Sequence, residues 1–217
     1  RTGQRSRDAS RQDGNDDIRL SKSLSYLLRH GAKECGLQMR TDGFTRLEQV
    51  LAQKNLRQYK VEDIRRVVAD NHKQRFALVE EPFSEGEPVS LLIRANQGHT
   101  MQVPELALQI ITSPAELPVA LHGTYFHAWD TIRQQGLSRM ARNHVHLAEG
   151  EFGKVTSGVR QNCDLYIYID TARAMKEGVQ FLRSANGVIL TEGMGGLIPP
   201  HLFSRVLRTS DGSDIPL

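Results

Sequence analysis

The sequence predicts an α+β protein in which a helical lobe precedes a lobe of short strands. Leucines recur at helical spacing before residue 70, and short alternating apolar runs dominate after residue 75. The chain has 217 residues, of which 39% are hydrophobic and 24% charged, as in globular chains large enough for two lobes. No run approaches the roughly 20 apolar residues that a membrane helix needs, so no membrane partner is expected.

The first lobe begins with a helix whose leucine stripe runs over 20–28 and stops at Gly31. Two more helices and then two strands are expected at 45–53, 61–70, 75–80 and 89–95. Three helices followed by a β-hairpin is the element order of a winged helix, which is a variant of the helix-turn-helix used on nucleic acids.

The second half of the chain changes to the period of strands. Six strands are expected, at 119–122, 144–148, 164–170, 179–183, 187–191 and 203–207, with one helix at 128–135. Asn186-Gly187 between two apolar runs predicts a hairpin with a type I′ turn. Many strands with few helices favour a mixed, mainly antiparallel sheet.

The domain organisation follows from these elements and from composition. Residues at the start mix Arg and Asp with almost no apolar content, which is typical of disorder. The expected parts are a disordered tail (1–18), a winged-helix lobe (19–100), a linker or crossover (101–118), a second lobe (119–209) and a C-terminal tail (210–217).

Charge is unevenly distributed along the chain. Residues 19–75 carry 13 Lys and Arg against six Asp and Glu, whereas 76–121 carry Arg94 alone against six Glu. A basic third of a chain is expected of a surface that meets phosphates. A solvated helical face laced with ion pairs would have the same composition, and the sequence leaves both open.

Three short segments could deliver guanidinium groups to a phosphate. Arg29 and His30 end the leucine-rich helix, Arg94 ends a strand, and Arg160 ends the turn that begins at Ser157. A guanidinium fork suits bidentate phosphate contact. Taken singly, Arg29 could instead complement a helix dipole, and Arg94 could be an ion-pair partner among acids. Together they fit anion or phosphoryl chemistry without a metal.

Histidines and cysteines are the residues most able to bind a metal in this sequence. His144 and His146 have the spacing of a zinc half-site, but no third ligand is spaced to complete it, so no metal is expected. Cys35 and Cys163 are too few for a disulfide scaffold. The sequence therefore predicts a reducing compartment, that is, an intracellular protein of the cytoplasm or nucleus.

The chain resembles the NAD-dependent RNA 2′-phosphotransferases, the KptA family, over roughly residues 19–207. The matching runs, in order, are Leu20–His30, Asp42–Phe44, Ile93–His99, Leu121–Thr124, Asn143–Leu147 and Gly187–Thr191. Several motifs in one order make this a specific match rather than a single borrowed signature.

The resemblance implies a winged-helix RNA-binding lobe followed by a lobe of the ADP-ribosyltransferase fold. It implies a tRNA-splicing reaction that transfers the internal splice-junction 2′-phosphate of RNA to the co-substrate NAD. The RNA 2′-phosphate displaces nicotinamide to give an ADP-ribosylated RNA 2′-phosphate. The ribose 2″-hydroxyl then attacks phosphorus, which releases 2′-OH RNA and ADP-ribose 1″,2″-cyclic phosphate.

The resemblance also implies the site residues. The catalytic set maps to Arg29, His30, Arg94 and Arg160, of which His30 is the one able to move a proton near neutral pH. The NAD-binding set maps to His122, Gly123, Thr124 and His146, with an aliphatic third core position at Val188 or Ile189. An aliphatic residue there, in place of a carboxylate, would leave the ribose 2″-hydroxyl able to act as a nucleophile.

Two other functions stay open at this stage. An ADP-ribosyltransferase that caps terminal phosphates of RNA or DNA would begin with the same attack on NAD and stop there, and 5′-phosphorylated ends would then be partners. A winged-helix nucleic-acid-binding protein without catalysis is the other, although a bare binding module needs no Arg160. Nothing in the sequence demands a dimer, so a monomer is expected.

Overall fold

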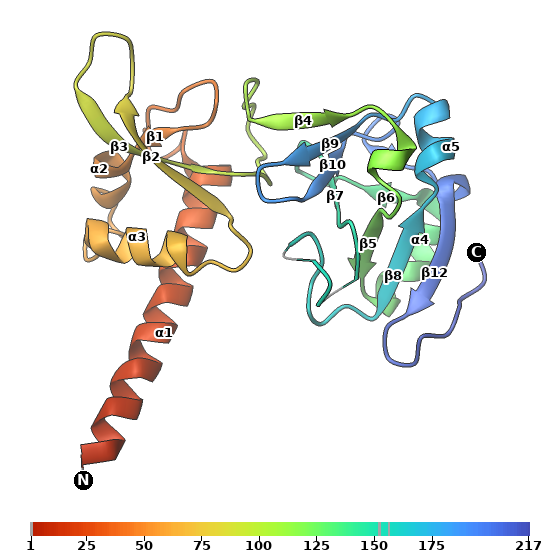
Figure 1. The fold of residues 1–217 in the computed structure, drawn as a ribbon, viewed down its shortest axis with the longest axis horizontal. Coiled ribbons are helices and arrows are strands. Elements are labelled where there is room, and N and C mark those ends of the chain that lie inside the picture. Colours follow the sequence, from red (N-terminus) through yellow and green to blue (C-terminus); the bar gives the residue numbers. More distant parts are fainter. Residues whose placement is uncertain (1, 152, 156) are drawn as a thin grey trace. The chain divides into compact units, whose positions relative to one another are not determined.

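The computed structural model describes residues 2–151, 153–155 and 157–217, with side chains from residue 14 onward. Figure 1 shows a mixed α+β chain with several small sheets and few helices. It divides into two compact units, the first ending at Leu106 and the second beginning at Ala107. Within the described ranges, no helix combines the length and apolar character that crossing a membrane requires.

The first unit packs helices against an antiparallel sheet with the strand order β1–β3–β2. Its elements are α1 (Thr2–Tyr26), the π-helical turn η1 (Leu27–Gly31), β1 (Thr45–Arg46), α2 (Leu47–Leu51), α3 (Val61–Ala69), β2 (Phe76–Pro82) and β3 (Val89–Ala95). The leucine stripe faces the core as its spacing predicts, and Leu20, Leu24 and Leu28 are fully buried.

The start of the chain differs from the expected disordered tail, because residues 2–18 belong to α1. No proline interrupts this stretch. Asp17 pairs with Arg66 of α3, with 2.8 Å between Oδ1 and Nη2. This ion pair connects the segment before the leucine stripe to the packed helices of the first unit.

The second unit is mainly antiparallel sheet, with strand orders β4–β9–β10–β7, β12–β8–β5 and β11–β6. Its strands are β4 (Leu108–Ile111), β5 (Leu121–Thr124), β6 (Leu137–Ser138), β7 (Val145–Leu147), β8 (Leu165–Ile169), β9 (Phe181–Ser184), β10 (Ile189–Thr191), β11 (Leu197–Ile198) and β12 (Phe203–Arg208). Its helices are η2 (Pro114–Glu116), η3 (Phe126–Ala128), α4 (Trp129–Gln135), α5 (Thr171–Lys176) and η4 (Pro200–Leu202). Trp129, Leu147 and Phe181 are buried in its core.

Two segments outside the expected second lobe contribute to this unit. Strand β4, inside the predicted linker 101–118, pairs with β9. The predicted tail 210–217 returns to β12, where the Ile215 amide donates to the Val206 carbonyl at 2.9 Å. Both segments therefore complete the sheets of the second unit.

The hairpin predicted at Asn186-Gly187 forms between β9 and β10, but its turn is not type I′. That turn needs positive φ at both residues, and Gly187 (φ +74°) has it whereas Asn186 does not. The Ser184 amide donates to the Val188 carbonyl at 2.9 Å, which encloses three loop residues. A type I turn followed by a left-handed glycine suits that loop length.

Candidate functional site

Arg29 and His30 lie on η1, where α1 ends in a π-helical turn. The Thr100 amide donates to the Arg29 carbonyl oxygen at 3.0 Å, and His30 Nδ1 lies 3.1 Å from Thr100 Oγ1. Because π turns add a residue to the helical repeat, they change which way side chains point, and they are frequent at functional sites. Thr100, far along the chain, thus hydrogen-bonds to the backbone of Arg29 and to the ring of His30.

The loop that follows β3 approaches Arg29 closely at Gly98. This glycine has a φ of +90°, and a Cβ built on it would lie 3.3 Å from Arg29 Nε. A side chain there would therefore be strained and would also displace the guanidinium. Gly98 lets the loop 97–100 lie against Arg29, which brings η1 and the end of β3 together.

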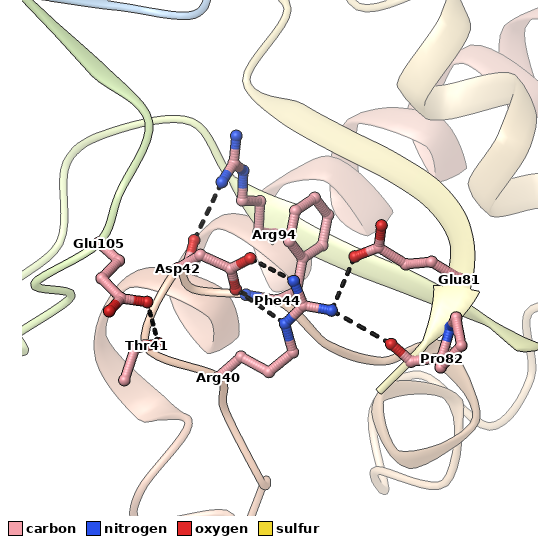
Figure 2. Close-up of polar contacts among 8 residues, drawn as sticks. All are labelled: Arg40, Thr41, Asp42, Phe44, Glu81, Pro82, Arg94 and Glu105. Carbon is pink, nitrogen blue, oxygen red and sulfur yellow. Dashed lines mark hydrogen bonds and ion pairs between the residues drawn. The ribbon is translucent and has the colours of Figure 1, made fainter. Parts of the chain in front are cut away.

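Arg94, the penultimate residue of β3, is 9% exposed. Its Nη1 donates to the Asp42 carbonyl oxygen at 3.1 Å, as Figure 2 shows. The guanidinium carbon lies 4.5 Å from the centroid of the Phe44 ring. Burial lowers the pKa of Arg94, but an arginine remains charged at neutral pH.

The carboxylate of Asp42 is engaged by Arg40 rather than by Arg94 (Figure 2). Arg40 Nε lies 3.1 Å from Asp42 Oδ1 and its Nη2 lies 2.5 Å from Oδ2, and Nη1 reaches Glu81 Oε1 at 2.7 Å. Burial raises the pKa of Asp42, but the hydrogen bonds from Arg40 and the Phe44 amide outweigh it and leave the pKa lowered. Arg94 makes no ion pair with any described side chain, so the ion-pair alternative for Arg94 is wrong within that part of the chain.

His122 and His146 lie on the neighbouring strands β5 and β7 of the second unit. His122 Nδ1 lies 2.8 Å from the His146 carbonyl oxygen, and His146 Nδ1 lies 3.0 Å from that of His144. A carbonyl only accepts, so each Nδ1 carries a hydrogen, and in a neutral ring with this tautomer Nε2 is the acceptor. Burial, together with the nearby Arg160 and Arg142, lowers the pKa of His122, although the bond to the carbonyl raises it. His122 is therefore neutral at pH 7.

Arg160 is exposed at the end of the turn 157–160, with its guanidinium carbon 5.9 Å from the Tyr125 ring centroid. Ser157 Oγ donates to the Asn186 carbonyl oxygen at 2.7 Å. Val159 packs over β5, where a Cβ on Gly123 would lie only 2.7 Å from its Cγ2. Gly123 thus allows the turn that carries Arg160 to lie directly against the strand that carries His122.

The register of β10 separates the two candidates for the third core position. Ile189 is paired with Leu147 and packs into the hydrophobic core, whereas Leu190 is paired with His146. Directly opposed residues share a face, and continued alternation would put Val188, which directly precedes β10, on that face too. Val188 and Ile189 are both fully buried, so this alternation is what distinguishes them, and it agrees better with Val188.

Two residues missed by sequence reasoning join these sets. Leu190 shares the face of His146 through register, which the sequence does not specify. Arg142 is half-buried, and burial followed by the repulsion of Arg160 lowers its pKa, so its charge lies near the Arg160 turn. Its position two residues before His144 could have indicated it.

The structure brings Arg29, His30 and Arg94 together in the first unit around the loop 97–100. It brings Arg160, His122, Gly123 and His146 together in the second unit, and buries Thr124 beside them on β5. That all four catalytic candidates act on one phosphate stays a prediction. Among the described residues, no three His, Cys, Asp or Glu side chains gather as a metal-ligand set.

Comparison with known proteins finds a match to the family described as RNA 2′-phosphotransferase, Tpt1 / KptA family, over residues 15–193. The chain is 50% identical over 214 residues to tRNA 2′-phosphotransferase 1 of Danio rerio, covering 95% of this chain and 92% of the relative. It is 46% identical over 212 residues to tRNA 2′-phosphotransferase 1 of Homo sapiens, covering 95% and 82%. It is 36% identical over 201 residues to tRNA 2′-phosphotransferase of Saccharomyces cerevisiae, covering 88% and 84%. With its motifs on structured strands and turns, the chain belongs to the Tpt1/KptA family of RNA 2′-phosphotransferases.

Proposed function

We propose that this protein is an NAD-dependent tRNA 2′-phosphotransferase that acts on the internal 2′-phosphate of a splice junction. The observation that carries the proposal is Arg94, a buried guanidinium without an ion-pair partner among the described side chains. A buried charge is costly unless it is compensated, and a phosphate dianion is the natural compensation. The relatives named tRNA 2′-phosphotransferase support the same substrate.

The proposed reaction has two displacements. An oxygen of the RNA 2′-phosphate bonds to the nicotinamide-bearing carbon of the ribose, and nicotinamide leaves with the electron pair of its glycosidic bond. The ribose 2″-hydroxyl then attacks phosphorus, and the RNA 2′-oxygen leaves and takes up a proton. The products are 2′-OH RNA, nicotinamide and ADP-ribose 1″,2″-cyclic phosphate.

In this proposal Arg29 and Arg94 hold the 2′-phosphate and stabilise the charge that develops on its oxygens. Arg160 joins them as the resemblance implies. His30, held by Thr100 at 3.1 Å, is the proton carrier for the departing 2′-oxygen. The chemistry needs donors that are oriented in advance, and the contacts of the loop 97–100 with the Arg29 guanidinium and the His30 ring support these roles.

The proposed NAD-binding residues are His122, Gly123, Thr124, His146 and Val188, with Ile189 set aside because it pairs with Leu147, on the other face from the pair of Leu190 and His146. Their chemistry fits a dinucleotide, because the Nε2 atom of the neutral His122 imidazole can accept a hydrogen bond from a ribose hydroxyl. An aliphatic third position leaves the ribose 2″-hydroxyl free to react. The helix and hairpin order of the first unit and the antiparallel sheets of the second support a winged-helix lobe and an ADP-ribosyltransferase-like lobe.

The test is a short RNA with one internal 2′-phosphate, incubated with NAD without added metal and followed by mass spectrometry. Loss of the phosphate together with release of nicotinamide and ADP-ribose cyclic phosphate is expected. A persisting ADP-ribosylated RNA would instead indicate the end-capping reaction. If wild type consumes no NAD while it binds the RNA, the enzyme proposal is wrong and the chain is a binding module. Arg94→Ala is the control that links the products to this site.

A further inference from the structure

Ion pairs neutralise the two arginines of α3, Arg65 and Arg66, and Arg46 of β1. Arg65 pairs with Glu80 (2.5 Å) and Arg46 with Glu87 (2.5 Å). Arg66 pairs with both Asp17 and Asp63. The basic segment and the acidic segment that follows it in sequence therefore compensate each other on this face. In a winged helix α3 would be the element that meets nucleic acid, but here its arginines are already occupied.

A groove of about 420 Å³ on another part of the first unit is lined by positive charges that no ion pair neutralises in the described ranges. It is lined by Lys22 and Tyr26 of α1, by Cys35 and by Lys54 after α2. Lys22 and Lys54 are exposed, and neither makes an ion pair with any side chain in the described ranges. The groove therefore combines an apolar floor with two uncompensated ammonium groups.

Tyr26 connects this groove to the candidate catalytic residues. Its side chain is 56% exposed, and its ring centroid lies 6.0 Å from that of His30. The ring rests on Gly31, where a Cβ would lie 2.9 Å from Tyr26 Cε1. A large aromatic side chain is thus held in an exposed position beside His30, and an alanine at position 31 would displace it.

We infer that this groove binds the nucleotide adjacent to the one that carries the 2′-phosphate. Its base stacks on Tyr26, and the RNA backbone phosphates lie near Lys22 and Lys54. Stacking on an exposed aromatic side chain tolerates any base, and lysines supply the salt-dependent attraction to phosphates. This inference rests on the proposed function, since it is the placement of the reacting phosphate near His30 that brings a neighbouring nucleotide to Tyr26.

Binding of a labelled pentanucleotide with a central 2′-phosphate tests the groove without NAD. Tyr26→Ala is expected to weaken binding about tenfold, whereas Tyr26→Phe, which keeps the stacking face, stays near wild type. The double variant Lys22→Gln/Lys54→Gln should reduce the slope of log affinity against log salt by about 1.4. Adenosine 2′-phosphate, which has no neighbouring nucleotide, should bind all these variants as it binds wild type.

The matched control is Arg65→Gln on α3, an exposed cation of the same unit that is already paired. It should leave RNA affinity unchanged. Weaker binding of Arg65→Gln, together with unchanged binding of the Tyr26 and lysine variants, would overturn the inference in favour of α3. Circular dichroism melts of each variant separate lost binding from lost folding.

Cys35 gives an independent readout, because its exposed thiol lines the groove while Cys163 is buried. The pentanucleotide should slow alkylation of Cys35 by iodoacetamide and leave Cys163 unreactive in both states. Unchanged Cys35 labelling at saturating RNA would contradict the groove. If wild type protects Cys35 but forms no product with NAD, the proposed function fails and the groove stands. If wild type forms the products but the groove variants bind RNA normally, the proposed function stands and the groove inference fails.

Discussion

Arg94 and Arg160 belong to the same predicted catalytic set, yet their surroundings are opposite. Arg94 is 9% exposed, bonded to a backbone carbonyl and packed on Phe44 in the first unit. Arg160 is exposed at the end of a turn in the second unit, 5.9 Å from Tyr125. The comparison indicates that one guanidinium is restrained by packing and a hydrogen bond, whereas the other is exposed to solvent.

The largest effect is expected at Arg94. Arg94→Ala should lower kcat/KM for the 2′-phosphorylated RNA about 100- to 1000-fold, because it removes a donor that is already oriented. Arg94→Lys should recover little, since an ammonium cannot reproduce the fork or the stacking on Phe44. Steady-state kinetics on the RNA used above measures both.

Arg46→Ala is the matched control for Arg94. Arg46 is also partly buried in the sheet of the first unit, with its guanidinium 3.9 Å from the Phe83 ring centroid, but it pairs with Glu87. Its loss should lower thermal stability and leave kcat/KM within about twofold of wild type, as for a change away from the site. Equal losses of activity in the two variants would mean that Arg94 acts through folding alone.

Arg160 should respond differently to the same pair of substitutions. Arg160→Ala is expected to lower kcat/KM about 100-fold, as other electrostatic donors do. Arg160→Lys should recover to within about tenfold of wild type, because an exposed side chain can move to place its charge. If lysine rescues Arg94 and Arg160 equally well, burial does not distinguish their roles and the comparison fails.

Periodicity predicted the parts of the fold that burial controls. The leucines at 20–28 are in the core, and the strand predicted at 89–95 is β3 with those bounds. The helix predicted at 45–53 is shortened, because Thr45 and Arg46 pair with Ile93 and Leu92. Such a loss depends on a partner strand more than 40 residues away, which local spacing does not report.

Sequence motifs indicate candidate site residues, but they do not give the electrostatics around them. Motifs indicated Arg29, His30 and Arg94 as candidates, but they do not show that the first two lie on a π turn whose backbone is bonded to Thr100. Whether Arg94 would be paired was decided by Arg40, which takes the Asp42 carboxylate. Competition of that kind among side chains is a tertiary property, so sequence alone left both outcomes open.

A substitution at Gly123 tests whether the turn that carries Arg160 packs directly on β5. Gly123→Ala would place a Cβ 2.7 Å from Val159 Cγ2 and 3.0 Å from Cys163 Sγ. Overpacking of this kind costs about 1–3 kcal/mol of unfolding free energy, and displacement of the turn should raise the KM for NAD. Adding Val159→Ala should relieve the contact, so the double variant should be more stable than the sum of the two single changes predicts. Strict additivity in urea denaturation would contradict the packing of this turn on β5.

The smallest expected effect is on stability in acid. The second unit should lose stability at a higher pH than the first unit. Burial lowers the pKa of His122 in the folded protein. Below about pH 6.5 the unfolded chain therefore binds more protons than the folded one, and the free energy of unfolding decreases as the pH is lowered. The pKa of Asp42 in the first unit is also lowered, but for a carboxyl the corresponding loss begins only near pH 4. Trp129, the single tryptophan, is buried in the second unit, so its fluorescence reports on that unit. Between pH 7 and pH 5 the urea midpoint reported by Trp129 should fall, while amide exchange in β2 and β3 stays slow.

His122→Asn is the control for this prediction. It should reduce the dependence of the urea midpoint on pH. An unchanged dependence in that variant would assign the acid sensitivity to other groups, such as His144, whose pKa burial also lowers.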